Sequence, residues 1–584
     1  MYYVADFETT TLESDCRVWA YAVCEVGNPD NIIYGTNIDD FMEWCKSQKE
    51  NVKVFLHNLK FDGQFILYWL FHHDFKHVID THDRASNTFT TLISDKGLYY
   101  SIEVIFKLKG KNVKKVTFLD SLKLIPLSVD QIAKSFKFPI QKGSIDYDSH
   151  NHLPPDTPLT DEEISYIKND VQIVAHAVDF FHKQGLNKMT IGSCAMNEYK
   201  NLINKKNFKW WFPEPHYHDD VKKSYRGGFT YLYPKFAGKI LGSGVVLDVN
   251  SLYSSVMYDC YLPFGTPIFF TGKYEYDDMY PLYTQMMRCG FKLKKGKIPT
   301  IQLKHNPFFN GNEYLTSSDG HEITLCLNSV DLKLFFEHYD VYNPEYLSGW
   351  KFKSTKGLFT KYIDKWSNNK IQAKKDGNHG LYIISKLYLN SLYGKFGADN
   401  KVRSKVPYLD GDDSVHYYDT DPEPKKPVYI AIASFITSHA RLKTISAFQH
   451  ILDNYNNGVS KAEPVYADTD SLHIVLNGED EETFFKNCGL DIDSTKLGAW
   501  DYECKFNKAK YLRQKCYIEN MTEDKDNPDP EYKLKITVAG MPKDCYPYVN
   551  FRNFKIGATY KGKKQPKQVE GGVILKDIDF TIKG

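Results

Sequence analysis

The sequence predicts a multidomain protein of mixed α/β and α+β class, on three observations. Its 584 residues suit about four compact units, at roughly 150 residues per domain. The first 188 residues alternate strand-like and helical patterns, as an α/β unit does. The remainder contains a strand that leads straight into a helix, a helical pair and a hairpin, and is interrupted by two segments of different composition, 261–357 and 398–427.

Charge and cysteine content exclude several classes of protein. The 74 Lys and Arg residues nearly cancel the 73 Asp and Glu residues, which excludes a uniformly basic nucleic-acid coat but allows local basic grooves. Eleven cysteines without a Cys-x-x-Cys pair argue against a disulfide framework or a zinc module and favour reduced thiols. Neither a leader segment nor an apolar run of about 18 residues is evident, so we expect no export and no membrane.

The first unit contains four clear elements. Thr160 and Glu163 form a predicted capping box at the start of the last of them, and Gly185 is its expected C-terminal cap. We therefore place the domain boundary near residue 188. The expected strands are Tyr2–Phe7 and Val52–His57, and the expected helices are Asp62–Leu70 and Glu162–Phe181.

Later elements follow in order. A strand at Val245–Asp248 turns directly into a helical pattern that ends near Cys260. A helical pair is expected over about 358–394, and a loop that feeds a β-hairpin over Gly458–Val475. The insertion 261–357 indicates a small α+β unit, and the last ~45 residues predict short strands in a Lys-, Pro- and Gly-rich context.

A first set of acidic residues lies in the N-terminal unit. Asp6 and Glu8 emerge on one face of a strand, whereas an isolated Asp-x-Glu at a strand end is usually solvated. Asp62 follows an apolar strand, and Tyr166 and Asp170 stack four residues apart beside an apolar helical stripe, where a carboxylate needs a partner. Four acids from two strands, a loop and a helix suit two hard cations about 3.5–4 Å apart that activate water.

A second set of acidic residues lies in the C-terminal part. Asp248 ends a buried strand, and Asp468 and Asp470 stand between two β-rich arms, where the simplest interpretation of Asp-Thr-Asp is a hairpin turn. The apolar arms would nevertheless draw all three acids to one face of a sheet. That arrangement is unfavourable unless cations neutralise the charge.

Between the two sets, a helix presents a mixed polar face. Lys386, Asn390 and Tyr393 fall within roughly 60° of one another on a helix, with Lys370 further N-terminal. Such a face could hold a triphosphate and stack on a nucleotide. A solvated face is the usual explanation for one lysine, but it does not explain why the aromatic side chain and Gly394 complete the pattern.

These motifs resemble known families. Asp-x-Glu, Asn-x-x-Phe-Asp and Tyr-x-x-x-Asp, in that order within 170 residues, resemble the three motifs of the RNase H-like, DnaQ-type 3′–5′ exonucleases. Asp-x-x-Ser-Leu-Tyr, Lys-x-x-x-Asn-Ser-x-Tyr-Gly and Asp-Thr-Asp resemble the right-hand family B DNA polymerases. Tyr225-Arg226-Gly227-Gly228 and Lys515-Cys516-Tyr517 look like elements of their protein-primed branch, the terminal-protein-primed bacteriophage DNA polymerases. The resemblance covers essentially the whole chain.

This resemblance implies a division of the chain into domains. It predicts an exonuclease domain at 1–188, a palm at 189–260 and 428–538, fingers at 358–397 and a thumb at 539–584. The insertions at 261–357 (terminal-protein region) and 398–427 (strand displacement and processivity) would encircle the template and unwind downstream DNA.

The resemblance also implies roles for individual polymerase residues. Asp248, Val249 and Asp470 would ligate the metals, with Asp468 in support, and Tyr253 would exclude a ribose 2′-OH. Lys370, Lys386, Asn390 and Tyr393 would bind the incoming nucleotide. Tyr225, Gly227, Gly228, Lys515 and Tyr517 would contact DNA.

In the exonuclease, the resemblance makes Asp6, Glu8, Asp62 and Asp170 metal ligands, with Tyr166 orienting the attacking water and Lys142 supporting catalysis. The positions that match residues gripping the frayed 3′ strand are Thr9, His57, Asn58, Phe61, Ser121, Leu122 and Tyr147. Aromatic stacking on single strands is tolerant of sequence.

The expected activity is protein-primed, processive, strand-displacing DNA synthesis with 3′–5′ proofreading, on a linear phage genome. Cofactors would be two Mg²⁺ per site, which Mn²⁺ would replace, and partners would be primer-template and single-stranded DNA, dNTPs and a terminal protein. We expect a monomer in the cytoplasm of an infected bacterium. The Lys-rich runs 107–115, 292–297 and 561–567 would track phosphates, although each alone more often marks a solvated surface.

Alternatives remain open on the sequence. The C-terminal half could be a non-catalytic DNA-binding scaffold attached to an exonuclease, or the chain a structural nucleic-acid-binding protein; near-neutral charge counts against the latter. A reverse transcriptase would normally carry adjacent acids in its hairpin. Two departures from the family pattern stand out: Ser254 replaces the usual Pro, and a longer 372–381 stretch makes the alignment of Lys370 and Tyr382 uncertain.

Overall fold

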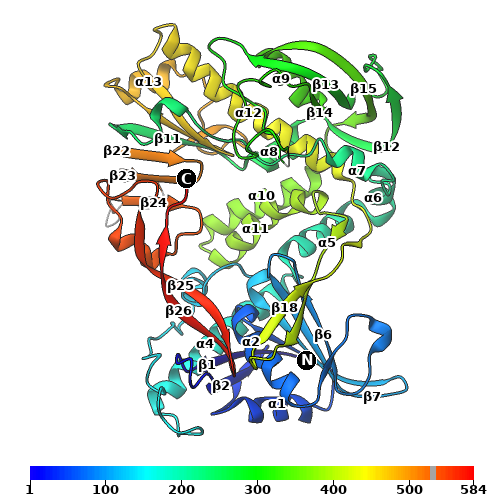
Figure 1. Cartoon of the computed structure of the whole chain (residues 1–584), viewed down its shortest axis with the longest axis vertical. Coiled ribbons are helices and arrows are strands. Elements are labelled where there is room, and N and C mark those ends of the chain that lie inside the picture. Colours follow the sequence, from blue (N-terminus) through cyan, green and yellow to red (C-terminus); the bar gives the residue numbers. More distant parts are fainter. Residues whose placement is uncertain (305, 526–533) are drawn as a thin grey trace.

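The computed structural model describes residues 1–304, 306–525 and 534–584. Position 305, in the predicted first insertion, and positions 526–533, in the predicted second palm segment, lie outside the described residues. The N-terminal α/β unit forms one end of the molecule, two further sheets form the other end, and a pair of helices lies between them (Figure 1). Mixed α/β and α+β architecture is thus confirmed.

The N-terminal unit is built on a twisted eight-stranded sheet with the order β3-β2-β1-β4-β8-β7-β6-β5. β1 runs antiparallel to β2 and parallel to β4, and β4 runs parallel to β8. α4 (Asp161–Lys183) packs on β1 and β2, and its capping box between Thr160 and Glu163 is present. The other elements are β1 (Tyr2–Thr9), β2 (Val18–Glu25), β3 (Asn28–Gly35), α1 (Ile38–Ser47), β4 (Val52–Leu56), α2 (Leu59–His72), β5 (Lys76–His77), β6 (Thr88–Ile93), β7 (Tyr99–Lys109), β8 (Asn112–Asp120) and α3 (Val129–Phe136).

A second sheet forms the C-terminal body, with β11 at its centre between β21 and β22. Val245, Leu247 and Ile474 point from one face into a core shared with α8 and α12, whereas Val246 and Val475 pack on the other face, as the twofold period of a strand dictates. The acidic residues therefore lie on the opposite face. The elements are β9 (Thr230–Leu232), β10 (Ile240–Leu241), β11 (Gly244–Val249), α8 (Leu252–Asp259), α12 (Ile430–Asn456), β20 (Glu463–Asp468), β21 (Ser471–Val475), α13 (Glu481–Asn487), β22 (Trp500–Arg513), β23 (Cys516–Asp524) and β24 (Leu534–Val538).

The predicted helical pair is present. α10 (Thr360–Lys375) and α11 (His379–Phe396) pack against each other and lie between the two ends of the molecule, beside α5 (Ile191–Ile203) (Figure 1). Two short helices, α6 (Lys205–Trp211) and α7 (His218–Lys222), lead from α5 towards the C-terminal sheet. Tyr199, Phe212 and Phe396 form one aromatic cluster that joins these helices.

The first predicted insertion is a four-stranded antiparallel sheet with the order β12-β15-β13-β14, with helix α9 beside it. Its strands are longer than the short runs that the scattered Pro and Gly residues suggested, because glycines and prolines here sit at bulges rather than at strand ends. The elements are β12 (Leu262–Thr271), β13 (Leu282–Leu293), β14 (Ile323–Asn328), α9 (Ser329–His338) and β15 (Tyr339–Thr355).

Two long hairpins meet on the N-terminal unit. β17 and β18 project from the second predicted insertion, and β25 and β26 project from the C-terminal segment, so that both reach α2 (Figure 1). Val415 and Val573 are buried in the same core as Phe65. The C-terminal strands are therefore long rather than short. The elements are β16 (Lys401–Val402), β17 (Lys405–Leu409), β18 (Val415–Asp419), β19 (Glu423–Pro424), β25 (Thr559–Val569) and β26 (Gly572–Thr581).

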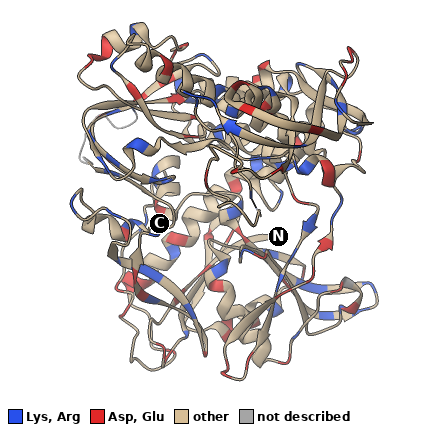
Figure 2. Ribbon diagram, turned by 45° about the horizontal axis from the view of Figure 1, so that its top comes forward, with Lys and Arg blue, Asp and Glu red and all other residues tan. Residues whose placement is uncertain are grey.

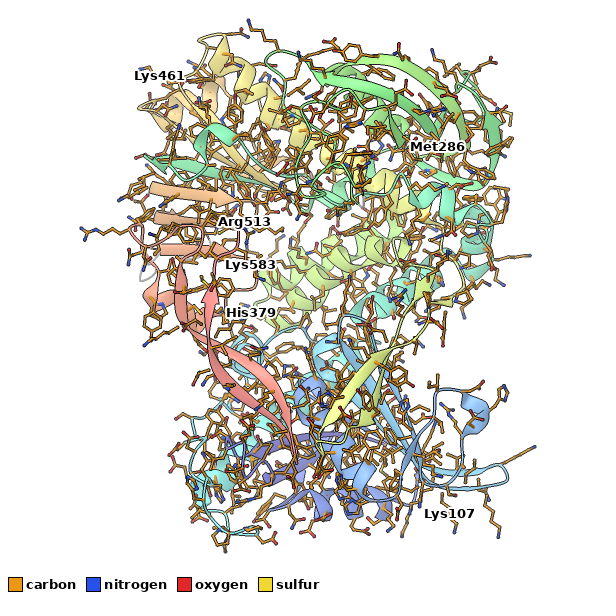
Figure 3. All side chains as sticks on the ribbon, in the orientation of Figure 1. Lys107, Met286, His379, Lys461, Arg513 and Lys583 are labelled. Atoms are coloured by element: carbon orange, nitrogen blue, oxygen red, sulfur yellow. The ribbon has the colours of Figure 1, made fainter. Side chains whose placement is uncertain are left out.

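Basic and acidic residues are interspersed along the ribbon at both ends of the molecule (Figure 2). Lys107 lies on the part of the β7–β8 hairpin that protrudes from the N-terminal unit (Figure 3). It is far from Lys583, near the C-terminus, whose carbonyl accepts a hydrogen bond from Arg513. No helix among the described residues has the length and apolar character that crossing a membrane requires.

Candidate active sites

The first acid set converges on one place between β1, α2 and α4. Asp6 and Glu8 lie on β1, Asp62 lies in the first turn of α2 and Asp170 lies in the middle of α4. The set therefore comes from one strand and two helices, not from two strands, a loop and a helix. The reason is that α2 begins directly at Leu59, so that Asp62 is already helical.

Burial and mutual repulsion raise the pKa values of these carboxyls. The pKa of Asp6 is raised to about 7, first by burial and then by Asp170. Burial, followed by Asp6, raises the pKa of Glu8 and of Asp62 well above the usual range. Because a buried cluster of carboxylates is unfavourable without positive charge, the site fits bound divalent cations.

Lys142 supplies part of that positive charge. Its ammonium group forms an ion pair with Oδ2 of Asp170, while Oδ1 of the same carboxylate is buried without a hydrogen-bond partner. An orphaned carboxylate oxygen on a residue close to Asp6 and Glu8 is suited to ligate a cation. The hydroxyl of Tyr166 lies 3.2 Å from that of Tyr147 and close enough to Glu8 for this carboxylate to raise its pKa.

The predicted strand-binding residues gather around the start of α2. Nδ1 of His57 lies 2.9 Å from the hydroxyl of Ser121, and Nε2 lies 2.7 Å from the carbonyl of Leu127. The backbone amides of Asn58 and Leu122 both donate to Oδ1 of Asp120. Thr9 ends β1 beside Glu8, Phe61 lies in the first turn of α2 next to Asp62, and Tyr147 is exposed.

The second acid set lies at the end of the C-terminal sheet. Asp248 is the penultimate residue of β11 and lies opposite Ser471, and Asp468 and Asp470 flank the turn of the β20–β21 hairpin. The amide of Val249 donates to the carbonyl of Asp470 over 2.8 Å, which fixes the strand against the turn. The three acids predicted to share one sheet face are thus brought together.

Sequence reasoning missed further charged residues that surround this set. A cavity of about 440 Å³ is lined by the three acids together with Glu503 and Lys535, whose side chains form an ion pair of 3.1 Å. Asp501 lies opposite Asp248 on β22. The signal was available: Asp501 and Glu503 form an Asp-x-Glu on a strand, the same pattern that marked Asp6 and Glu8.

The electrostatics of the second set resemble those of the first. The pKa of Asp248 is raised to about 8, by burial first and then by Asp470 and Glu503, while Lys535 opposes the rise. Burial also raises the pKa of Asp470. These carboxyls likewise fit divalent cations, which would favour their ionised form.

The Lys-x-Tyr element lies beside the acidic turn. The ammonium group of Lys515 is 3.1 Å from Oδ1 of Asp468, and the Tyr466 hydroxyl donates to Oδ2 over 3.1 Å. The amide of Lys515 in turn donates to the Tyr466 oxygen over 2.9 Å. Tyr517 lines the same cavity and packs against Tyr466, with ring centroids 5.1 Å apart.

The linker motif supports the turn from the other side. A Cβ atom on Gly228 would lie 2.7 Å from Oγ1 of Thr469, so only glycine allows this approach. The amide of Thr469 donates to the carbonyl of Phe229, and the Arg441 guanidinium donates to the carbonyl of Gly227. Tyr225 packs against Gly397 at the end of α11, and its hydroxyl leaves no room for a Cβ atom on Gly397.

The predicted nucleotide-binding residues also converge. Tyr253 on α8 stacks on Tyr393 of α11, with ring centroids 4.0 Å apart and planes at 21°. Lys386 and Lys370 are close enough for Lys386 to lower the pKa of Lys370, after burial as the main cause. Asn390 is exposed on the same helix as Lys386. Tyr382, at the position where the sequence leaves the alignment with the family pattern open, has its ring centroid 6.0 Å from the Lys370 ammonium group.

The departure at Ser254 has a structural consequence. Its buried hydroxyl donates to the carbonyl of Leu389 over 3.2 Å and so joins α8 to α11. A proline at this position could not make that bond.

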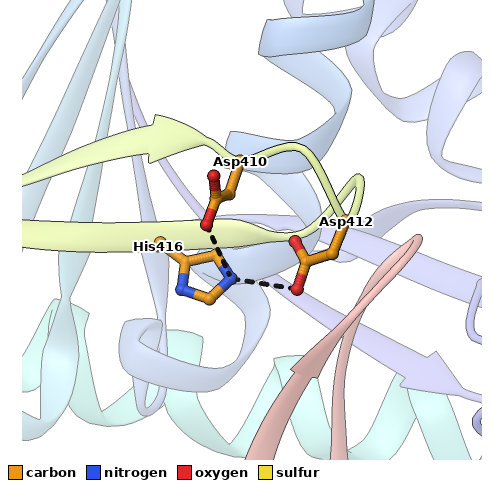
Figure 4. Close-up of side chains that lie close together, drawn as sticks. All are labelled: Asp410, Asp412 and His416. Atoms are coloured by element: carbon orange, nitrogen blue, oxygen red, sulfur yellow. Dashed lines mark hydrogen bonds and ion pairs between the residues drawn. The ribbon is translucent and has the colours of Figure 1, made fainter.

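A third group of potential ligands lies elsewhere. Asp410, Asp412 and His416 bring three ligand atoms within 4.8 Å of one another at the exposed turn of the β17–β18 hairpin (Figure 4). Nε2 of His416 lies 3.2 Å from Asp412 and 3.9 Å from Asp410. These contacts close the turn, and the group contributes no residue to either acid set.

Comparison with known proteins gives one consistent result. The family described as DNA polymerase type B, organellar and viral, matches residues 44–156 and 150–483. DNA polymerases of Bacillus phage Nf and Bacillus phage B103 are 45% and 44% identical to the chain, over 99% of it and 99% of their own lengths. The DNA polymerase of Streptococcus phage Cp-1 is 32% identical over 100% of this chain and 98% of its own.

Solved structures agree with the sequence relatives. The Phi29 DNA polymerase in complex with primer-template DNA and incoming nucleotide substrates superposes with a TM-score of 0.91 at 43% identity, with all of both chains covered. The same polymerase with single-stranded DNA gives a TM-score of 0.89 at 42% identity, again over both whole chains. The chain therefore belongs to the organellar and viral type B DNA polymerases and is a DNA-directed DNA polymerase.

Proposed function

We propose that this protein replicates a linear phage genome by protein-primed, processive and strand-displacing synthesis, and that it proofreads through a separate 3′–5′ exonuclease site. One observation supports this most directly: a single chain carries two acid clusters, one largely buried and one half-buried, each with its own lysine and tyrosine partners. Two complete sites fit two opposed reactions on the same DNA strand. A polymerase without proofreading would have no need of the first cluster.

In the polymerase site, Asp248, Asp470 and the carbonyl of Val249 would hold two Mg²⁺ ions, which Mn²⁺ would replace. When bound, the cations lower the pKa of the attacking 3′-hydroxyl and stabilise the pyrophosphate that leaves. Lys386 and Lys370 neutralise the triphosphate. Among the described residues, neither ammonium group has a carboxylate within 4.0 Å, so both positive charges are available to a ligand. Asn390 and Tyr393 pack around the nascent base pair, and Tyr253 excludes a ribose 2′-OH.

Lys515 and Tyr517 contact the primer strand in this proposal. Both line the cavity with the acids, and Lys515 already faces Asp468. A phosphate that approached this cavity would therefore meet a positive charge next to the catalytic turn. Tyr225, Gly227 and Gly228 contact DNA from the opposite side of that turn.

In the exonuclease site, Asp6, Glu8, Asp62 and Asp170 would hold the cations, and water would attack the last phosphodiester of a frayed 3′ strand. Tyr166 orients the water, because its hydroxyl lies near Glu8. Lys142 holds Asp170 in place through their ion pair. Thr9, His57, Asn58, Phe61, Ser121, Leu122 and Tyr147 bind the single strand.

The proposed partners are primer-template and single-stranded DNA, dNTPs and a terminal protein whose hydroxyl group starts synthesis. The protein acts as a monomer in the cytoplasm of an infected bacterium. The two hairpins that meet on α2 support processivity, since a closed path around DNA would oppose dissociation. The β12–β15 sheet is the region proposed to receive the terminal protein.

The decisive experiment uses the protein alone with Mg²⁺, dNTPs and a primed single-stranded circle. Products much longer than one circle are expected, because strand displacement must follow the first round. Degradation of the primer without extension would refute polymerisation and leave only the exonuclease. Protein priming is tested separately, by transfer of a labelled dNMP to a terminal protein without any nucleic-acid primer.

A further inference from the structure

The short helix α6 presents a basic and aromatic surface that neither active site uses. Lys205, Lys206, Lys209 and Trp210 are all exposed, and Trp210 keeps 66% of its surface accessible. At 100° per residue they fall within roughly 140° of one another, on one side of the helix. We call these four residues the α6 platform.

Positive charge on the platform is not neutralised by neighbouring acids. Residues 199–213 contain four lysines and no Asp or Glu. The flanking acids are paired elsewhere: Glu198 with Lys365, and Glu214 with Lys426 over 2.8 Å. Among the described residues, no carboxylate lies within 4.0 Å of the ammonium groups of the three platform lysines. An ordinary solvated surface of this protein, with nearly equal numbers of both charges, would be expected to mix them.

Helix α6 is anchored to the protein core on the side opposite the platform. Phe208, on the other side of α6, packs against Phe212 and Phe396, with ring centroids 5.2 Å and 6.3 Å apart. Asn204 caps the helix by accepting a bond from the Lys206 amide over 2.9 Å. Within the part of the chain that the structure describes, Trp210 contacts one other ring, that of Phe264 at 5.9 Å. Most of the Trp210 surface is therefore accessible for stacking.

The position of α6 indicates which DNA strand its platform would meet. Lys426, just after β19, forms an ion pair of 2.8 Å with Glu214, which lies three residues after the end of α6, so the platform adjoins the base of the second insertion. Phe396 also ends α11, the helix that carries the nucleotide-binding face. On the function proposed above, this insertion separates downstream DNA, and the strand that it removes from the template emerges unpaired.

We infer that the α6 platform binds the displaced non-template strand as single-stranded DNA. Trp210 stacks on its bases, and Lys205, Lys206 and Lys209 contact its phosphates. This combination of an aromatic stacking surface with unpaired cations is what binds single strands without regard to sequence. Capture of the displaced strand would oppose its return to the template and so favour forward movement.

The inference rests on the proposed strand displacement and is tested by binding to forked DNA. The probes are two primer-template duplexes with a downstream strand, one of which carries a 5′ tail of about 20 unpaired nucleotides. Affinities are measured without divalent cations, so that neither acid set reacts. Wild type should bind the tailed fork more tightly, and Trp210→Ala should remove about fivefold or more of that advantage, the equivalent of about 1 kcal/mol for one stacked base.

Charge is tested through salt dependence. Removing the three platform lysines together, as K205A, K206A and K209A, should reduce the slope of log affinity against log salt by about 2 for the tailed fork only. Matched controls are Tyr34→Ala, which removes an exposed aromatic side chain from the edge strand β3 of the N-terminal unit, and the triple alanine variant of exposed Lys49, Lys461 and Lys486. Neither control should change the preference for the tail.

Synthesis assays separate the possible outcomes. Trp210→Ala should slow extension through a downstream duplex while leaving extension on a primed single-stranded template unchanged. Equal slowing on both templates would assign α6 to the template strand and overturn the inference, as would an unchanged preference for the tailed fork. If wild type extended neither template, the proposed function itself would fail, a result distinct from either.

Discussion

The ammonium group of Lys515 lies 3.1 Å from Oδ1 of Asp468, and this contact joins the start of β23 to the turn that carries Asp468 and Asp470. The Lys515 side chain is about half exposed, so the pair itself contributes at most about 1 kcal/mol to stability. Its significance is positional. The lysine lies where a primer phosphate could replace Asp468 as its partner.

Replacing Lys515 with alanine should therefore weaken primer-template binding without unfolding the protein. We expect a loss of roughly tenfold in affinity at low salt, a smaller salt slope and a melting temperature close to that of wild type. Lys515→Arg should restore most of the affinity, because it keeps the charge. Gel-shift titrations at two salt concentrations measure this, and equal affinity of the alanine variant and wild type would contradict the assignment.

The two acid sets should be separable by mutation. Asp470→Ala should abolish nucleotide addition and leave 3′–5′ degradation of single-stranded DNA largely intact, because the first set shares no residue with the second. Asp6→Ala with Asp62→Ala should have the opposite effect. Primer-extension and degradation assays on the same preparations provide the measurement, with folding checked by circular dichroism. Loss of both activities in one correctly folded variant would show that the two-site assignment is wrong.

Stability of the metal-free protein should depend on pH through the same carboxyls. The pKa of Asp6 is raised to about 7 and that of Asp248 to about 8 from a usual value of 3.8. Because their protonated forms suit the buried sites, the stability that they contribute is fully present below about pH 4 and is lost as pH rises through 7 to 8. We expect the free energy of unfolding to fall over that range.

Magnesium ions should offset this loss, since they favour the ionised carboxylates. Denaturant titrations at pH 5 and pH 8.5, with and without Mg²⁺, should show stabilisation by the metal mainly at the higher pH. The matched control is the Asp6→Asn, Asp248→Asn variant, which should show a smaller fall with pH and a smaller metal effect. Equal stabilisation at both pH values would argue against cation binding by these acids.

Tyr253 should control discrimination against ribonucleotides. Its ring stacks on Tyr393 with centroids 4.0 Å apart, which leaves the Tyr253 side chain little freedom to move away from a 2′-OH. Tyr253→Val should raise the kcat/KM for ribonucleotides relative to deoxynucleotides by about tenfold or more. Single-nucleotide insertion kinetics test this. Tyr393→Leu, which removes the stacking partner but keeps Tyr253, should give a smaller change, and an unaltered ratio in Tyr253→Val would exclude the steric role.

Short-range geometry made individual pairs within the two acid sets predictable from the sequence. Asp6 and Glu8 share a strand face through the twofold period of a strand, and Tyr166 and Asp170 share a helix face through a spacing of four. The capping box at Thr160 and the hairpin around Asp468 and Asp470 were predictable for the same reason. Family resemblance then supplied roles that no local pattern contains.

The surroundings of those acids depend on the tertiary fold. Glu503 and Lys535 reach the second site from β22 and β24, and Val415 and Val573 reach the core of the N-terminal unit from two distant hairpins. Such contacts depend on how sheets twist and pack, and the energy that fixes them comes from burial shared among segments far apart in the chain. Local periodicity indicates which face of an element is buried, but not which distant residues cover it.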